Sequence, residues 1–249
     1  MILIGNGSLI TRNAAEPYYE NGAVVTENEL IKETGTTAEM RLKYPDAEFV
    51  DAKGGVIMPA FINAHTHIYS ALARGLSIAG YNPTNFYEVL DGMWWKMDRI
   101  LTLEDTRRSA YTTIIDCIKT GCTTIFDHHA SFCQIEGSLF AIADAAKALG
   151  IRACLCYEVS ERDGEKKCDE SIEENRSFID YCERENDPML KAMFGGHALF
   201  TIGDKTFEKC VKANGGRTGF HIHVCEGMND VYDSMKNYGC RSVNRLLYN

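Results

Sequence analysis

The sequence lacks the features that place a protein in a membrane or on a nucleic acid. Its 249 residues contain no apolar run near the roughly 18 residues that a membrane-spanning helix needs. They also contain no cluster of Lys and Arg that could bind phosphates, and the net charge is −9. The N-terminal stretch MILIGNGSLI has no basic flank and no cleavage-site pattern, so it does not read as a secretory signal. We therefore expect no nucleic-acid partner and no membrane partner.

The chain also has no C-x-x-C pair, although it contains ten cysteines. This scattered spacing argues against a disulfide framework and against a cysteine-based zinc site. Several cysteines lie in apolar segments, such as Cys154 and Cys156 in IRACLCYEV. We expect reduced cysteines that serve as small core residues, which is typical of a cytoplasmic protein.

Two patterns divide the chain near residue 57. Residues 1–57 contain short β-type runs separated by turn residues, and they predict a small antiparallel β unit. From residue 58 to residue 249, apolar strand-like runs alternate with amphipathic helices, which indicates an α/β fold around a parallel sheet. The strands are predicted at 56–65, 123–130, 151–159, 190–199 and 218–226. The helices are predicted at 104–120, 137–149, 170–185, 204–214 and 228–238, the first of them beginning with a capping box formed by Thr102 and Asp105.

All seven histidines fall at the carboxyl ends of predicted strands. They are His65, His67, His128, His129, His197, His221 and His223. Parallel α/β sheets bring ligand and catalytic groups to these ends, and in a (β/α)8 barrel the ends converge on one face. A single histidine would usually be an ordinary, partly buried side chain. Seven at one edge of the sheet predict a functional site.

The H-x-H spacing of His65 and His67 places both side chains on one face of a strand, where they can bind one metal ion. His221 and His223 share a face in the same way, and Glu226 follows where that strand ends. A carboxylate beside a metal-binding histidine is suited to moving protons at the metal site.

Several motifs resemble those of one enzyme superfamily. PAFINAHTH, FGGHALF and TGFHIHVCEG are similar to the first-, fourth- and fifth-strand motifs of the amidohydrolase superfamily. YNPTNFYEVLDGMWW and TTIFDHHASF resemble its chlorohydrolase and nucleobase-deaminase branch, closest to the SsnA-type aminohydrolases. Ala60 and Leu199 depart from the usual glycine and proline, and we interpret both as packing changes.

The resemblance implies a fold, a reaction and residue roles. The fold would be a (β/α)8 TIM-type barrel preceded by a small β-sandwich domain, of which residues 1–57 form the N-terminal half. The reaction would be hydrolytic deamination of an amino-substituted, purine-like heterocycle by one metal-activated water. The roles would be metal ligation by His65, His67 and His223, proton transfer by Glu226, and substrate contact by His197, His128 and His129. His221 would support the ligands, and an aromatic wall would come from Tyr69, Tyr81, Phe86, Trp94 and Trp95. The superfamily usually forms dimers or larger homo-oligomers.

One metal ion is expected, because binuclear relatives carry a carboxylated lysine at the end of the fourth strand. Here that end carries His197, and Lys191 lies six residues earlier, roughly 20 Å along an extended strand. Three imidazoles are compatible with zinc, our first choice, and with iron.

The chain is short for this fold. A barrel takes roughly 250 residues, whereas 192 follow residue 57, and only five strands are predicted. The relatives also need a histidine on the sixth strand and an aspartate on the eighth. No histidine follows His223, and we expect Asp230 and Asp233 to be solvated on a helix. The sequence therefore predicts a C-terminally incomplete barrel with a partial metal site and negligible turnover on its own.

Two alternatives remain open. The first is ring opening of a cyclic amide by the same scaffold, which two metal ions per chain would favour. The second is a non-catalytic, metal-binding or complex-forming subunit, which full metal occupancy without activity would favour.

Overall fold

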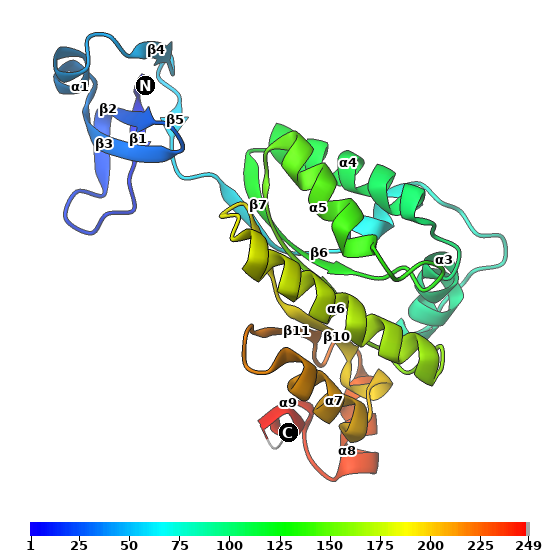
Figure 1. Cartoon of the computed structure of the whole chain (residues 1–249). Helices are drawn as coiled ribbons and strands as arrows, with labels where there is room; N and C mark the ends of the chain where they lie inside the picture. The colour runs from blue at the N-terminus through cyan, green and yellow to red at the C-terminus, as the bar shows by residue number, and fades with distance from the viewer. Residues whose placement is uncertain (248–249) are drawn as a thin grey trace. The chain divides into compact units, whose positions relative to one another are not determined.

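The computed structural model describes residues 1–247 and divides them into two compact units (Figure 1). The first unit is Met1–Ala60, and the second begins at Phe61. No helix within residues 1–247 is long and apolar enough to cross a membrane.

The first unit is a five-stranded sheet with one helix. Its elements are β1 (Ile2–Ile10), β2 (Tyr18–Glu27), β3 (Leu30–Thr36), α1 (Thr37–Lys43), β4 (Glu48–Asp51) and β5 (Val56–Ile57). The strand order is β3-β2-β1-β4, and β5 also pairs with β1. The pairs β1–β2 and β2–β3 are antiparallel, whereas β4 and β5 pair with β1 in parallel. The expectation of an antiparallel unit is therefore wrong in part, because α1 lies in a crossover that returns the chain in the same direction.

The second unit alternates parallel strands with helices. Its strands are β6 (Phe61–Thr66), β7 (Cys122–His129), β8 (Arg152–Tyr157), β9 (Leu190–Ala192), β10 (Phe194–Ala198) and β11 (Phe220–His223). Strands β6-β7-β8-β9 form one parallel sheet, and β10-β11 form another. A single bridge between Val159 and Gly196 joins the end of β8 to β10. These parallel strands with their helices form part of a barrel-like fold. The predicted α/β class is confirmed.

The predicted helices are present, and others join them. They are α4 (Leu103–Lys119), α5 (Ser138–Leu149), α6 (Glu165–Glu185), α7 (Asp204–Asn214) and α8 (Met228–Tyr238). The capping box of Thr102 and Asp105 starts α4, and Gly150 in the left-handed region ends α5. The sequence did not predict η1 (Ile68–Ala73), α2 (Phe86–Val89), the π-helix η2 (Leu90–Trp94), α3 (Trp95–Asp98) or α9 (Ser242–Leu247).

The core of the second unit lies between the four-stranded sheet and its helices. Ile114 of α4, Ile142 of α5 and Phe178 of α6 are fully buried with Ile125 and Leu155 of the sheet. Helix α5 packs on β8, and α6 packs on β8 and β9. This packing fixes the strands, so their carboxyl ends, which carry the histidines, are held in place.

Candidate metal centre

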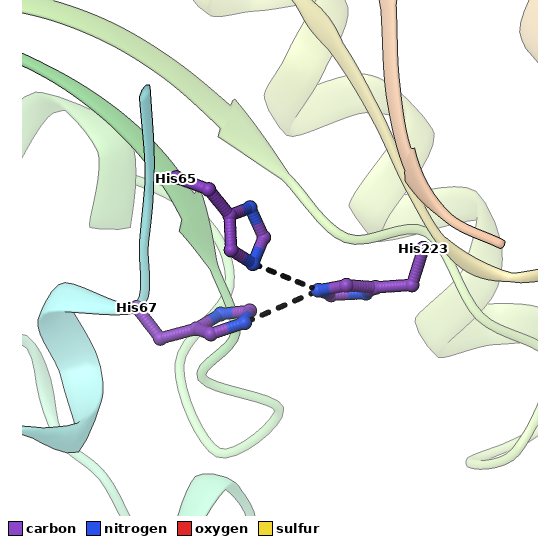
Figure 2. Close-up of side chains that lie close together, drawn as sticks. All are labelled: His65, His67 and His223. Carbon is purple, nitrogen blue, oxygen red and sulfur yellow. Dashed lines mark hydrogen bonds between the residues drawn. The ribbon is translucent and has the colours of Figure 1, made fainter. Parts of the chain in front are cut away.

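Three histidines from two different sheets point toward one another (Figure 2). His65 lies in β6, His67 follows that strand directly, and His223 ends β11. The Nε2 atom of His223 lies 3.2 Å from Nε2 of His65 and 3.2 Å from Nε2 of His67. His223 follows His65 by 158 positions and His67 by 156 positions in the sequence. The three side chains nevertheless present imidazole nitrogens to one point.

The hydrogen bonds on the far side of two rings determine which nitrogens carry protons. Nδ1 of His67 lies 2.7 Å from the carbonyl oxygen of His128, and Nδ1 of His223 lies 2.8 Å from that of His197. A carbonyl oxygen only accepts, so both Nδ1 atoms donate and both Nε2 atoms keep lone pairs. Two lone pairs 3.2 Å apart repel unless a cation lies between them.

This donor set fits a divalent metal ion. Nitrogens at about 2.0–2.1 Å from a tetrahedral zinc lie roughly 3.3 Å apart, which agrees with the two separations of 3.2 Å. Backbone carbonyls that hold the second ring nitrogen are the usual support for metal-binding histidines. The ligand roles of the three residues stay a prediction, because their convergence is a matter of geometry alone.

His221 orients one member of the trio. Its Nε2 lies 2.9 Å from Nδ1 of His65, so one proton between the two rings fixes the orientation of His65. His221 is not part of the converging trio. Its contact with the far nitrogen of His65 is the kind that a supporting residue makes.

Burial favours the neutral form of His65, His67 and His221. Burial lowers the pKa of His67 to about 3, and the neighbouring His128 and His223 lower it further. Burial also lowers the pKa of His221 to about 4, and it lowers the pKa of His65 with help from His223. Neutral imidazole is the form that binds metals, so the site is prepared for a cation across the neutral pH range.

A cavity of about 150 Å³ opens beside the trio. It is lined by His67, Tyr69, Ser70, Phe86, Leu90, Trp94, Glu158, His197, His223 and Glu226. Glu226 and His197 thus line the cavity, and the chemical roles expected of them stay predictions. Of the aromatic residues expected to form a wall, Tyr69, Phe86 and Trp94 line this cavity, while Trp95 packs against Arg162.

The remaining two predicted site residues lie behind the cavity wall. His128 and His129 are fully buried and are not among the described residues that line the cavity. Nε2 of His128 lies 3.0 Å from the carbonyl oxygen of Gly196, and Nε2 of His129 lies 2.9 Å from the hydroxyl of Ser131. Their direct contact with a substrate stays a prediction. The ring of His128 supports β10, whereas that of His129 supports the turn after its own strand.

Sequence reasoning missed a buried chain of charged groups. Oδ2 of Asp98 lies 2.5 Å from Nη2 of Arg162, and that nitrogen lies 3.5 Å from Oε1 of Glu158. Oε2 of Glu158 lies 3.1 Å from Nδ1 of His128. The signal was present in YEVSERD, where an acid is the second-last residue of the predicted strand 151–159 and an arginine follows four residues later.

Local backbone features hold the histidines in position. Oδ1 of Asp127 accepts a hydrogen bond of 2.7 Å from the backbone N–H of Ile68, directly after His67. At Gly195 in β10, a Cβ atom would lie 2.2 Å from the carbonyl oxygen of Tyr157, so only glycine permits this close approach before His197.

Asp230 is not solvated, contrary to expectation. Its side chain is buried, and Oδ2 accepts a hydrogen bond of 2.6 Å from the backbone N–H of Cys225. The carboxylate caps the loop after β11, because the start of α8 folds back onto that loop. This contact fixes the segment that carries Glu226.

Comparisons with known proteins identify the family of this chain. The profile of the Amidohydrolase family matches residues 56–245, and a profile of an imidazolonepropionase-like composite domain of bacteria matches residues 22–47. The 5'-deoxyadenosine deaminase of Methanobrevibacter smithii is 31% identical over 90% of this chain and 49% of its own length. The 5-methylthioadenosine/S-adenosylhomocysteine deaminase of Syntrophomonas wolfei is 30% identical over 98% of this chain and 54% of its own.

A solved structure shows the same fold. It is an adenosine deaminase from Xanthomonas campestris with bound zinc, 22% identical, with a TM-score of 0.78 over 98% of this chain and 54% of that one. The chain therefore spans about half the length of the relatives and structures that it matches.

Proposed function

The chain belongs to the amidohydrolase family, and from that premise we propose that the protein is a metal-dependent aminohydrolase. Its reaction would be hydrolytic deamination of an amino-substituted, purine-like heterocycle. One observation carries the proposal: three imidazole nitrogens converge at the edge of a cavity that Glu226 also lines. The adenosine-derivative deaminases among the matched proteins support the choice of substrate class.

His65, His67 and His223 would hold a single divalent cation, zinc in the first place and iron as the alternative. When bound, the cation supplies Lewis acidity toward water and the ring carbon. Imidazole ligands bind metals in their neutral form, so the site would keep the full positive charge of the ion.

Glu226 would move the protons. Its carboxylate accepts a proton from the attacking water and delivers it to a ring nitrogen, which makes the amino-bearing carbon more electrophilic. The proton of the added hydroxyl would then move, by way of Glu226, to the amino group, which leaves as ammonia while the oxygen remains as a ring carbonyl. Tyr69, Phe86 and Trp94 would hold the flat ring and exclude bulk water from it.

Ammonia release tests the proposal directly. The full product of the gene is loaded with zinc and incubated with aminated purines and triazines, and ammonia is measured by a coupled assay. We expect turnover with at least one purine, and a loss of at least about 100-fold in kcat for Glu226→Gln. Glu226→Gln keeps the shape of the side chain, so metal content should stay equal in the two proteins. A zinc-loaded protein that releases no ammonia from any of these rings would contradict the proposal.

One observation favours a second candidate function. Two further groups of side chains lie close enough to hold a cation: His67, His128 and Glu158, and Glu158, His197 and His223. A stoichiometry of two metal ions per chain would favour ring opening of a cyclic amide. Metal analysis of the purified protein distinguishes the two, since deamination as proposed needs one ion.

A further inference from the structure

Two side chains on the cavity wall present hydrogen-bond acceptors that the proposed reaction does not use. Glu158 follows the end of β8, and His197 lies in β10. Both are nearly fully buried, with exposed fractions of 2% and 4%, and both line the cavity. Their hydrogen-bond partners show which atoms remain available to a ligand.

His197 exposes a lone pair. The hydroxyl of Thr201 donates to the carbonyl oxygen of Ala198 at 2.9 Å, so its oxygen must accept from Nδ1 of His197 at 2.8 Å. Nδ1 therefore carries the proton of the neutral ring, and Nε2 is an acceptor. Burial lowers the pKa of His197 well below its usual value, which keeps the ring neutral.

Glu158 also keeps an acceptor oxygen, whichever atom holds the shared proton. Nε2 of His128 faces the carbonyl oxygens of Gly196 and His221 at 3.0 and 3.2 Å, so it donates. One proton must then lie between Nδ1 of His128 and Oε2 of Glu158, which are 3.1 Å apart. Oε1 accepts in either case, since the group beside it is the donor Nη2 of Arg162 at 3.5 Å.

The Glu158 carboxyl group is held rigidly. Arg162 is fixed by Asp98 at 2.5 Å and lies over the rings of Phe132 and Trp95, 4.0 and 5.2 Å from their centroids. His128 fixes the other oxygen. A polar group that is buried and pre-oriented in this way discriminates strongly between ligands that pair with it and ligands that do not.

We propose that Glu158 is a specificity-determining residue that accepts a hydrogen bond from a second N–H group of the heterocycle, beyond the amino group that is lost. With His197 as a neighbouring acceptor, the cavity selects rings that carry an additional amino or ring N–H donor. This inference rests on the proposed function for the placement of the ring. It assigns the protein to substrates of the 2-aminopurine type over rings without that donor.

Paired ligands test the inference without turnover. Purine and 2-aminopurine differ in one amino group, and both lack the 6-amino group that adenine-type substrates lose. Isothermal titration of the zinc-loaded full protein should show 2-aminopurine binding about 10- to 100-fold more tightly than purine, because a buried acceptor left unpaired is costly.

Two variants locate the effect. Glu158→Met replaces the acceptor with an apolar side chain of similar length. Purine and 2-aminopurine should then bind with affinities within about threefold of each other. Glu158→Gln can donate from its amide nitrogen to His128 and keep an acceptor oxygen, so it should retain most of the preference. Circular dichroism and zinc content show whether each variant is folded.

The outcomes separate this inference from the proposed function. Equal affinities in the unmodified protein overturn it, and so does a preference that survives in Glu158→Met. If Glu158→Met does not fold, the ratio in the unmodified protein and in Glu158→Gln decides. A preference for 2-aminopurine without ammonia release from any aminated ring would support Glu158 recognition and refute deamination. Deamination of adenine without a preference for 2-aminopurine over purine would support the proposed function and refute recognition by Glu158.

Discussion

The first unit pairs charged side chains at its surface, whereas the second unit has surface pairs and also buries charged side chains. In the first unit, Lys43 pairs with Glu33 at 2.7 Å, and the two side chains are 57% and 32% exposed. In the second unit, Arg162 pairs with Asp98 at 2.5 Å, and the two side chains are 5% and 0% exposed. Burying charge costs more free energy than a surface pair returns. A buried chain of charges beside a cavity therefore indicates a functional site, whereas the surface pairs indicate only a solvated sheet.

The strongest test of this contrast removes one imidazole from the second unit. His223→Ala should weaken zinc binding by at least about 100-fold, because it removes a lone pair from the converging trio. His221→Ala is the matched control in the same strand and should weaken binding by only about tenfold. Competition with a chelator of known affinity measures both constants. Equal losses in the two variants would contradict the assignment of His223 as a ligand.

The buried ion pair should be the next most sensitive feature. Arg162→Met should lower the free energy of unfolding by about 3–5 kcal/mol, because it leaves Asp98 and Glu158 buried without their cation. Denaturant unfolding measures the change. The double variant Asp98→Leu with Arg162→Met should recover part of the loss, since one of the uncompensated carboxyl groups is then removed. No recovery would mean that Arg162 acts through packing alone.

A third test uses pH. Burial raises the pKa of Asp127 to about 8, so the folded protein holds a proton there that the unfolded chain releases above about pH 4. This contribution to stability is complete below pH 4 and is lost as pH rises toward 8. Asp127→Asn lacks this titration, so it should gain stability relative to the unmodified protein by at most about 1.4 kcal/mol per pH unit. Parallel stability profiles between pH 5 and 8 would show that Asp127 does not titrate as described.

The smallest effect is expected in the first unit. Lys43→Ala removes the surface pair with Glu33, and the unfolding midpoint should stay within experimental error. The same measurement at high salt should show no difference between the two proteins. A large shift in the unfolding midpoint would mean that the surface pair of the first unit stabilises the fold as strongly as a buried pair.

Sequence periodicity predicted most elements of the second unit, because each strand and helix has a clear apolar pattern. It also predicted which histidines lie at the carboxyl ends of strands. It could not predict the break between β9 and β10 or the π-helix at Leu90–Trp94, since both depend on packing against residues far away in the chain. Glu158 was missed for a related reason: its burial follows from Arg162 and His128, and neither contact leaves a periodic pattern.

The separation of the strands into two sheets has a mechanical consequence. His65 and His67 belong to the end of the sheet that starts with β6, whereas His223 belongs to the pair β10–β11. Within the described residues, one isolated β-bridge, from Val159 to Gly196, connects these sheets. A cation bound by all three rings would also cross-link β11 to β6. Stripping that ion should accelerate amide hydrogen exchange in Phe220–His223 far more than in the centre of β7.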